Sequence, residues 1–298
     1  MEANQTNTFV WDKIFPKKIT LKKKGEIKSL GRQGMQIVDH RISEKGGMHK
    51  IDFSVKTSQE FQLQEYGMYA PVYESEIENP DAPIQASRDK VLMLKSIDNL
   101  TKEAQALSLA LDPANNTNNL QLTLADQFDN PNSDPYIVIK NAFESVRVSS
   151  GIRPNSMVLT QDVVNALANH PKVLERMKYT MTATDDEVVA FVKKSFGIQN
   201  VYITDTLSRS GGSDIDGGTL SPLVSKKILI YFSSEDAFLM PQSFGRCYMR
   251  KEAQVLEVPV SPDVTIKTGE VSLVAVRDEY QFVIANQDAG ILLYDVVS

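Results

Sequence analysis

The side chains best suited to chemistry are few in this chain of 298 residues, which has three histidines and one cysteine. His40 and His49 stand close in sequence, but two imidazoles without a third ligand make a poor metal site. His170 precedes a proline between two helical patterns, which predicts a capping or packing role. Cys247 lies in a strand-like run, where we expect a buried structural thiol. These residues predict neither a catalytic centre nor a metal site.

Acidic residues and glycines give no stronger sign of catalysis. Asp214 and Asp216 lie in the glycine-rich loop 210–218, but the other ligands and the closing glutamate of a calcium-binding loop are missing. Asp185 and Asp186 begin a helical pattern, where the helix dipole accounts for their negative charge. The motifs GxxxxGK(S/T), GxGxxG, HExxH and GxSxG are absent from the sequence. We therefore expect no enzyme activity, no cofactor and no bound metal.

Composition narrows the class of protein further. The chain has 32 Lys and Arg against 38 Asp and Glu, a formal net charge of −6, which excludes a globally basic coat for nucleic acid. Its 42% hydrophobic and 23% charged residues are typical of a folded protein. One cysteine leaves no intrachain disulfide, which favours a reducing compartment. No secretory signal begins the sequence, and no apolar run reaches the ~18–20 residues of a membrane span.

Helical patterns occupy the middle of the chain. Apolar residues recur every three or four positions from Met93 to Leu111, and Ser87 is a suitable N-cap for a helix about 36 Å long, ended by Asp112 and Pro113. Further helices are predicted to begin after Asp134, Thr160, His170 and Thr184 and, in two cases, to end at Gly151 and Gly197.

Strand-like runs dominate the end of the chain. Two short runs alternate with helices in 152–204, which predicts a compact α/β unit there. The later runs are Ile228–Phe232, Cys247–Met249, Val255–Val260, Val271–Arg277, Gln281–Ile284 and Ile291–Leu293. Helices in the middle followed by strands at the end predict the α+β class.

The first seventy residues combine a basic segment with an alternating pattern. Residues 13–32 contain eight Lys and Arg against Glu26 alone, which favours an arm that contacts a negatively charged surface but equally fits a solvated terminus. Ile51, Phe53 and Val55 share one face after the turn at Gly46 and Gly47. This pattern predicts an extended hairpin.

Several motifs add a specific signal to this order of elements. The most specific is PNSMVL at 154–159 followed by VNAL at 164–167 and HPKVLERMKY at 170–179. Others are YGMYAPV at 66–72, EIENPDAP at 76–83, SDP at 133–135 and FGI at 196–198. Together they resemble the major capsid proteins of tailed bacteriophages with the Hong Kong 97-type fold. The resemblance covers nearly the whole chain and is weakest in the first thirty residues and at 208–227.

The resemblance implies an L-shaped structural subunit without an active site, which self-assembles into an icosahedral or prolate capsid shell around viral double-stranded DNA. The implied divisions are an N-terminal arm at 1–32, an extended hairpin loop at 33–75, a peripheral domain with a spine helix at 76–149, an axial domain at 150–240, and a β-rich return through both domains at 241–298.

The resemblance also implies the contacts and partners of assembly. We expect the arm to contact neighbouring subunits through Lys17, Lys18, Lys22, Lys23 and Lys24, and the hairpin to do so through Lys45, His49, Lys50, Phe53 and Lys56. The expected partners are copies of the chain in pentamers and hexamers, with scaffolding, portal and decoration proteins, and DNA enclosed without sequence-specific binding. The implied location is the virion capsid, assembled in the host cytoplasm, with no membrane partner. In some relatives a hairpin lysine forms a cross-link, and Lys50 or Lys56 would be the donor here, although no motif identifies the acceptor.

Two other functions remain open. A bacterial nanocompartment shell, of the encapsulin type, has the same fold and encloses cargo enzymes instead of a genome. An enzyme or small-molecule binding protein would use the α/β unit at 152–204 and the glycine loop at 210–218, and would show a pocket with convergent polar groups.

Overall fold

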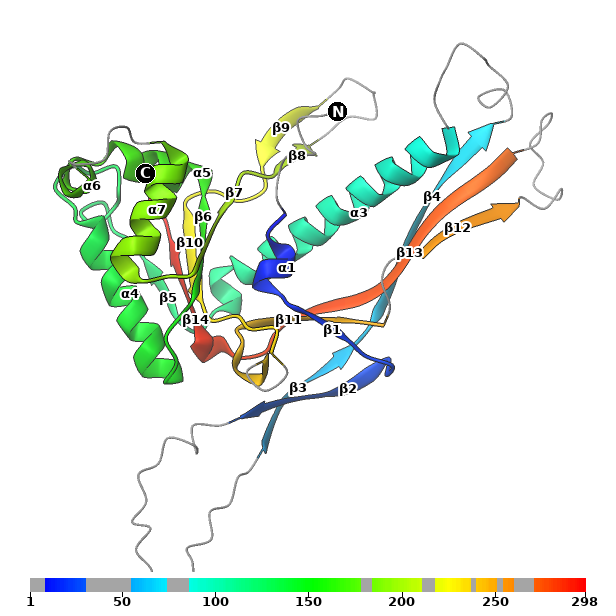
Figure 1. Cartoon of the computed structure of the whole chain (residues 1–298), viewed down its shortest axis with the longest axis horizontal. Helices are drawn as coiled ribbons and strands as arrows, with labels where there is room; N and C mark the ends of the chain where they lie inside the picture. Colours follow the sequence, from blue (N-terminus) through cyan, green and yellow to red (C-terminus); the bar gives the residue numbers. More distant parts are fainter. Residues whose placement is uncertain are drawn as a thin grey trace, which may run out of the picture.

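An elongated sheet with one long helix and a compact sheet with several short helices form the two parts of the molecule (Figure 1). The computed structural model describes residues 9–30, 55–73, 86–177, 184–210, 218–236, 240–250, 254–259 and 271–298. The expected hairpin tip, with His40 and His49, and the loop with Asp214 and Asp216 lie outside these residues.

The elongated sheet is organised around β13 (Val271–Ile284). On one side β13 pairs antiparallel with β4 (Gln64–Tyr73). On the other side it pairs antiparallel first with β12 (Gln254–Pro259) and then with β11 (Gly245–Met249). The short strand β1 (Lys17–Ile19) joins β11 in parallel and forms the edge of the sheet.

The single strand β13 corrects the sequence prediction of two strands, 271–277 and 281–284. Asp278 and Glu279 between the two runs are residues typical of a turn. In the structure Asp278 is buried, and its Oδ2 lies 2.5 Å from Nζ of Lys102 on the long helix. Because this partner neutralises the carboxylate, the strand continues through the acidic pair.

The long helix α3 (Ala86–Ala110) packs along the elongated sheet, as Figure 1 shows. Leu94 contacts Val72, Val274 and Val276 in a small cluster beneath its N-terminal half. Its apolar stripe is buried only in the C-terminal half, where Leu107 is fully buried; Met93 and Ile97 remain about half exposed. The buried face is partly charged instead, with Asp98, Lys102 and Glu103.

The compact sheet has the strand order β5-β14-β10-β6-β7. These strands are β5 (Asn119–Gln121), β14 (Gly290–Tyr294), β10 (Lys227–Tyr231), β6 (Ser156–Thr160) and β7 (Asn200–Thr204). Both faces of its central strands are buried. Met157 and Leu159 pack toward one core cluster, and Val158 packs toward another that also contains Leu107 of α3. Burial on both faces explains the uninterrupted apolar runs of β6 and β10.

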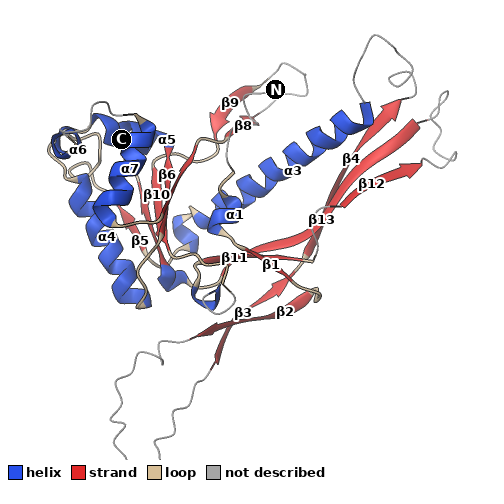
Figure 2. Ribbon diagram, viewed as in Figure 1, coloured by secondary structure: helices blue, strands red, loops and turns tan. Residues whose placement is uncertain are grey.

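Helices cover the first of these faces, and Figure 2 shows them gathered on one side of the compact sheet. They are α4 (Pro135–Ser150), α5 (Gln161–Asn169), α6 (Pro171–Arg176) and α7 (Asp185–Phe196). Two of the predicted N-caps are confirmed: Asp134 accepts from the backbone N–H of Ile137, and Thr184 forms a capping box with Glu187. Two are not, because Thr160 makes no capping hydrogen bond at the start of α5, and α3 begins at Ala86, so that Ser87 lies inside the helix it was predicted to cap. Gly151 ends α4 at φ 75°, a left-handed conformation that favours glycine.

The remaining described elements are short. A two-stranded ribbon is formed by β8 (Leu207–Ser210) and β9 (Thr219–Pro222). Single turns of 3₁₀-helix lie at η3 (Pro113–Asn115), η4 (Met240–Gln242) and η5 (Gln287–Ala289). The segment with β5 and α4 packs with the compact sheet, although the sequence grouped residues up to 149 with the spine helix.

Candidate assembly surfaces

The N-terminal segment is anchored on the long helix by one buried carboxylate. Glu103 Oε2 accepts hydrogen bonds from the backbone N–H groups of Val10, at 3.0 Å, and of Trp11, at 2.8 Å. These N–H groups lie at the start of the short helix α1 (Trp11–Ile14), whose Trp11 and Ile14 side chains enter the core. Glu103 is fully buried, and this burial raises its pKa to about 7, although the two N–H donors act in the opposite direction.

The chain then runs along the edge of the elongated sheet as β1. The backbone N–H of Cys247 donates to the carbonyl of Pro16 at 3.0 Å, and that of Thr20 donates to the carbonyl of Met249 at 2.7 Å. This strand was not predicted from the sequence, because a lysine-rich segment resembles a solvated terminus. Lysines are common on edge strands, where they oppose unwanted strand pairing.

The five arm lysines have different surroundings. Lys17 Nζ lies 5.2 Å from the centroid of the Trp11 ring, and Lys18 Nζ lies 5.7 Å from that of Tyr248. Lys23 Nζ forms an ion pair with Glu65 Oε1 at 2.6 Å. Lys22 is exposed in the bend after β1, and Lys24 is exposed at the start of β2. The five lysines therefore follow one another along the arm, but they do not converge on a single binding site.

The base of the hairpin is the strand pair β2 (Lys24–Leu30) and β3 (Val55–Gln62). It starts before residue 33, where the sequence analysis placed the hairpin, and β4 belongs to the elongated sheet rather than to the hairpin. The expected contact residues Lys45, His49, Lys50 and Phe53 lie outside the described residues, as does the side chain of Lys56 on β3.

A small apolar cluster of its own fixes the hairpin base on the sheet. It comprises Ile27, Phe61, Leu63, Tyr248, Val283 and Ala285. The Phe61 and Tyr248 rings are stacked with centroids 4.1 Å apart. Gly25 leaves room for this arrangement, since a Cβ at that position would lie 2.7 Å from Phe61 Cε1. None of these residues was among the contacts predicted from the sequence, where Gly25 and Phe61 stand out only as residues of lysine-rich and polar segments.

Large apolar side chains are exposed on three elements of the elongated part. Ile19 and Leu21 on the arm are 70% and 88% exposed. On β4, Tyr69 is 69% exposed and Tyr73 is 44% exposed, although Lys90 Nζ of α3 lies 5.7 Å from the Tyr73 ring centroid. Leu92, Met93 and Ile97 form an exposed stripe on α3 itself. Aromatic and apolar groups that gather on exposed faces are typical of protein contact surfaces.

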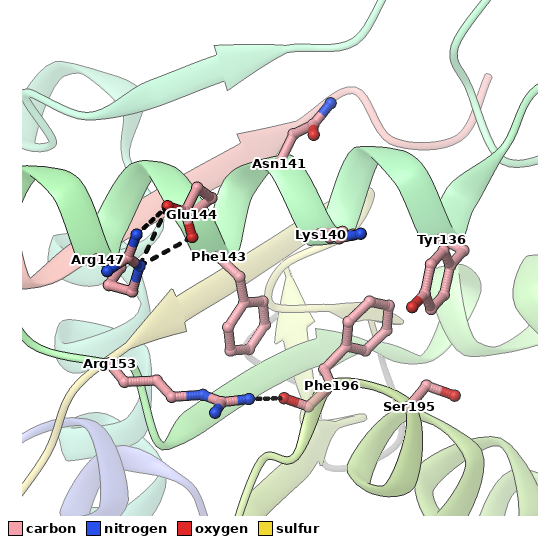
Figure 3. Close-up of a pocket in the computed structure, with 9 residues that line it drawn as sticks. All are labelled: Tyr136, Lys140, Asn141, Phe143, Glu144, Arg147, Arg153, Ser195 and Phe196. Atoms are coloured by element: carbon pink, nitrogen blue, oxygen red, sulfur yellow. Dashed lines mark hydrogen bonds and ion pairs between the residues drawn. The ribbon is translucent and has the colours of Figure 1, made fainter.

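A groove of about 510 Å³ lies between α4 and the end of α7 (Figure 3). Its floor is aromatic: the ring centroid of Phe196 lies 5.0 Å from that of Tyr136 and 5.7 Å from that of Phe143. The polar groups around it mostly contact each other or the backbone. Glu144 pairs with Arg147, and Arg153 Nη2 donates to the carbonyl of Phe196 at 2.9 Å. This arrangement suits an apolar or aromatic group better than a polar small molecule.

Two predicted structural roles are confirmed. His170 caps α6, where its Nδ1 accepts from the backbone N–H of Lys172 at 3.2 Å, and its Nε2 lies 3.0 Å from the carbonyl oxygen of Asn130. Cys247 is buried, and burial raises the pKa of its thiol to about 12.

Among the described residues, no three His, Cys, Asp or Glu side chains gather closely enough to hold a metal ion. None of the helices described is both long and apolar enough to span a membrane.

Known proteins with similar sequences are phage capsid proteins. The chain is 22% identical to the major capsid protein of Burkholderia phage BcepMu over 96% of its own length and 90% of the relative. It is 26% identical to the major capsid protein of Pseudomonas phage JBD67, over 57% of this chain and 54% of that relative. No protein-family model matches the chain.

Solved structures agree along nearly the full length. A phage-related protein from Bordetella bronchiseptica is 20% identical with a TM-score of 0.76, and covers 99% of this chain and 95% of its own. The capsid of cyanophage P-SCSP1u is 8% identical with a TM-score of 0.60, covering 98% and 89%. The encapsulin of Synechococcus elongatus is 9% identical with a lower TM-score of 0.55, covering 98% and 89%.

These comparisons confirm the resemblance that the motifs indicated and the α+β class that the element order predicted. The chain has the Hong Kong 97-type fold, and its sequence is similar to that of one phage major capsid protein over 96% of its length and to that of another over 57%.

Proposed function

We propose that this protein is the major capsid subunit of a tailed phage, a structural protein that assembles into the shell of the virion. The observation that carries the proposal is similarity to a phage major capsid protein over 96% of the chain, together with a shared fold over 99% of it. A fold alone does not define function. The sequence similarity to a named capsid protein supplies the second line of support.

The surfaces of the molecule suit assembly. A strand pair projects from the base of the elongated sheet, and a lysine-rich edge strand lies beside it. Exposed apolar side chains are present on the arm, on β4 and on α3. In a closed shell, many such contacts are repeated symmetrically, so that weak pairs sum to a stable particle.

The contacts predicted from sequence belong to this proposal. The arm acts through Lys17, Lys18, Lys22, Lys23 and Lys24, and the hairpin through Lys45, His49, Lys50, Phe53 and Lys56. Neutralising the five arm lysines together tests the first group: the proposal expects a lower particle yield, and an unchanged yield and particle stability would contradict it.

Finer assignments follow from the same function. The divisions belonging to this proposal are an N-terminal arm at 1–32, an extended hairpin loop at 33–75, a peripheral domain at 76–149, an axial domain at 150–240 and a β-rich return at 241–298. The shell is built from pentamers and hexamers, interacts with scaffolding, portal and decoration proteins, and is assembled in the host cytoplasm. It encloses double-stranded DNA without sequence-specific binding. An acidic subunit of net charge −6 supports this, because a strongly basic lining would bind phosphates tightly and hinder filling and release.

Negative-stain electron microscopy of the purified full chain tests the function directly. Closed polyhedral particles are the expected result, whereas a chain that stays monomeric even with a scaffolding protein would contradict it. The nanocompartment alternative, favoured only by the fold shared with an encapsulin, predicts small particles filled with cargo protein. Genome-length DNA in particles from infected or induced cells separates the phage capsid from that alternative.

A further inference from the structure

Arg246 is a buried arginine for which the described part of the chain supplies no acidic partner. Its side chain is only 1% exposed. Its Nε donates to the carbonyl oxygen of Met240 at 3.1 Å, and its Nη1 donates to the hydroxyl of Tyr248 at 3.2 Å. Its Nη2 is buried without any hydrogen-bond partner. Desolvating a charge is costly unless an opposite charge and hydrogen bonds compensate it, so this guanidinium is incompletely satisfied in the single subunit.

Lys18 lies at the surface above this buried charge. The parallel pairing of β1 with β11 places Lys18 opposite Tyr248, and its Nζ lies 5.7 Å from the Tyr248 ring centroid. Lys18, Tyr248 and Arg246 thus form a continuous path from an exposed ammonium group to a buried guanidinium. The pKa of Lys18 is lowered by partial burial and, second, by the charge of Arg246. Both cations therefore act on the same patch of surface.

The acidic side chains that the structure describes on the same sheet are already engaged elsewhere. Glu65 pairs with Lys23 and Arg277, Glu279 pairs with Arg250, and Asp278 pairs with Lys102. Among the described residues, no carboxylate forms an ion pair with Arg246. The missing negative charge must therefore come from outside this set.

We propose that a carboxylate side chain of a second copy of this chain binds at Lys18, where Arg246 supplies the supporting positive charge. The inference rests on the proposed function, because a shell subunit meets copies of itself over most of its surface. The chain carries 38 Asp and Glu against 32 Lys and Arg, so each copy has carboxylates to offer. The patch lies on the arm's edge strand, and the adjacent Ile19 and Leu21 are 70% and 88% exposed, as a contact surface requires. Lys18 is thereby distinguished from the other arm lysines.

Charge reversal at Lys18 in the full chain is the central experiment. Lys18→Glu places a carboxylate beside Arg246 within the subunit, so we expect the melting temperature of the unassembled subunit to rise by about 2 °C or more. The same change repels the incoming carboxylate, so we expect particle yield on a sucrose gradient to fall about tenfold or more. Lys95→Glu is the matched control, with an equal change of charge at an exposed position of α3 outside the arm, and it should leave both readouts near the wild-type values.

Arg246→Met separates this role from a purely structural one. Methionine fills similar space without a charge, so we expect the unassembled subunit to keep its melting temperature while particle yield falls. In the double variant with Lys18→Glu, the rise in melting temperature should disappear. If the rise persists without Arg246, or if Lys18→Glu assembles as well as the wild type, the inference is wrong.

Inorganic phosphate distinguishes a second copy from a free anion. If phosphate raises the wild-type melting temperature through Arg246 while Lys18→Glu still assembles normally, the site takes a free anion and the inference is overturned. A wild-type chain that forms no particles would instead contradict the proposed function, while the melting-temperature comparison would still test the pairing of residue 18 with Arg246.

Discussion

The Phe61 ring on β3 lies parallel to the Tyr248 ring on β11, with centroids 4.1 Å apart and planes 6° from parallel. The stack joins the base of the hairpin to the elongated sheet. It lies where β3 passes into β4 with only Leu63 between them, and where the backbone N–H of Leu63 donates to the carbonyl of Lys23 at 2.8 Å. We infer that this joint sets the direction in which the hairpin leaves the body of the subunit.

Removing the Phe61 ring should loosen this joint. Phe61 is 5% exposed, and truncation of a buried phenylalanine costs about 3–5 kcal/mol. We expect Phe61→Ala to increase hydrogen exchange of the β2 and β3 amides roughly hundredfold while the compact sheet remains protected. Exchange measured by mass spectrometry on the unassembled subunit checks this.

Tyr69→Ala is the control for that variant. Tyr69 is also an aromatic residue of the elongated part, but it is 69% exposed. We expect its removal to leave the exchange of β2 and β3 unchanged. Equal exchange in Phe61→Ala and wild type would show that the stack does not hold the hairpin base.

The buried carboxylate of Glu103 should make stability depend on pH. Its pKa rises from 4.5 to about 7 in the folded chain, mainly through burial. The folded state therefore binds more protons than the unfolded state between these values, so stability falls as pH rises through this window. The gap corresponds to roughly 3 kcal/mol. Glu103→Gln cannot ionise, and its amide oxygen can still accept from Val10 and Trp11. The quantity to measure is the free energy of unfolding in urea for both proteins. We expect the value for Glu103→Gln minus the value for the wild type to increase from pH 5 to pH 8, because only the wild type loses stability as the pH rises.

An exposed glutamate supplies the control for the pH series. Glu144 is paired with Arg147 at the surface, and Glu144→Gln should not gain on the wild type across this range. A constant difference between Glu103→Gln and wild type at all pH values would contradict the shifted titration.

Substitution of Lys102 should destabilise the fold more than substitution of an exposed lysine. Its Nζ lies 2.7 Å from Asp98 Oδ2 and 2.5 Å from Asp278 Oδ2, and all three side chains are buried. Lys102→Met leaves two carboxylates without their cation, so we expect a loss of about 3–5 kcal/mol in the free energy of unfolding. Lys95→Met on the exposed side of the same helix should cost little. Adding Asp98→Asn and Asp278→Asn to Lys102→Met removes the two unpaired charges, so part of the lost stability should return. If the triple variant is as unstable as Lys102→Met, the loss is due to packing and not to charge.

Local signals were sufficient for the longer helices. The long helix, predicted from an N-cap at Ser87 to Leu111, is found at Ala86–Ala110, and the caps at Asp134, Thr184 and Gly151 lie where the sequence placed them. Capping depends on hydrogen bonds within a few residues, so it can be read from a short segment. The motif resemblance supplied the fold, which periodicity alone did not define.

Distant contacts account for what was missed. The continuous strand β13 depends on the pairing of Asp278 with Lys102, 176 residues away. Glu103 is buried because it holds the start of α1, 92 residues away at Trp11. In the sequence, Arg246 resembles any polar residue of a half-buried strand. Its burial depends on the packing of other elements and could not be predicted from its own strand. These partners lie on separate elements, and no spacing within one element predicts them.

The thiol of Cys247 gives a test of how firmly β1 and β11 are held. Burial raises its pKa to about 12, so at pH 8 both the low thiolate fraction and the lack of access protect it. We expect a maleimide to label Cys247 only as fast as this part of the sheet opens. Leu21→Cys provides an internal reference, because residue 21 is 88% exposed just beyond β1, and its thiol should react within the mixing time of the experiment. Mass spectrometry of digested peptides separates the two sites. Since Cys247 is paired with Lys17 of β1, labelling at Cys247 as fast as at residue 21 would mean that the arm strand does not stay on the sheet in the unassembled subunit.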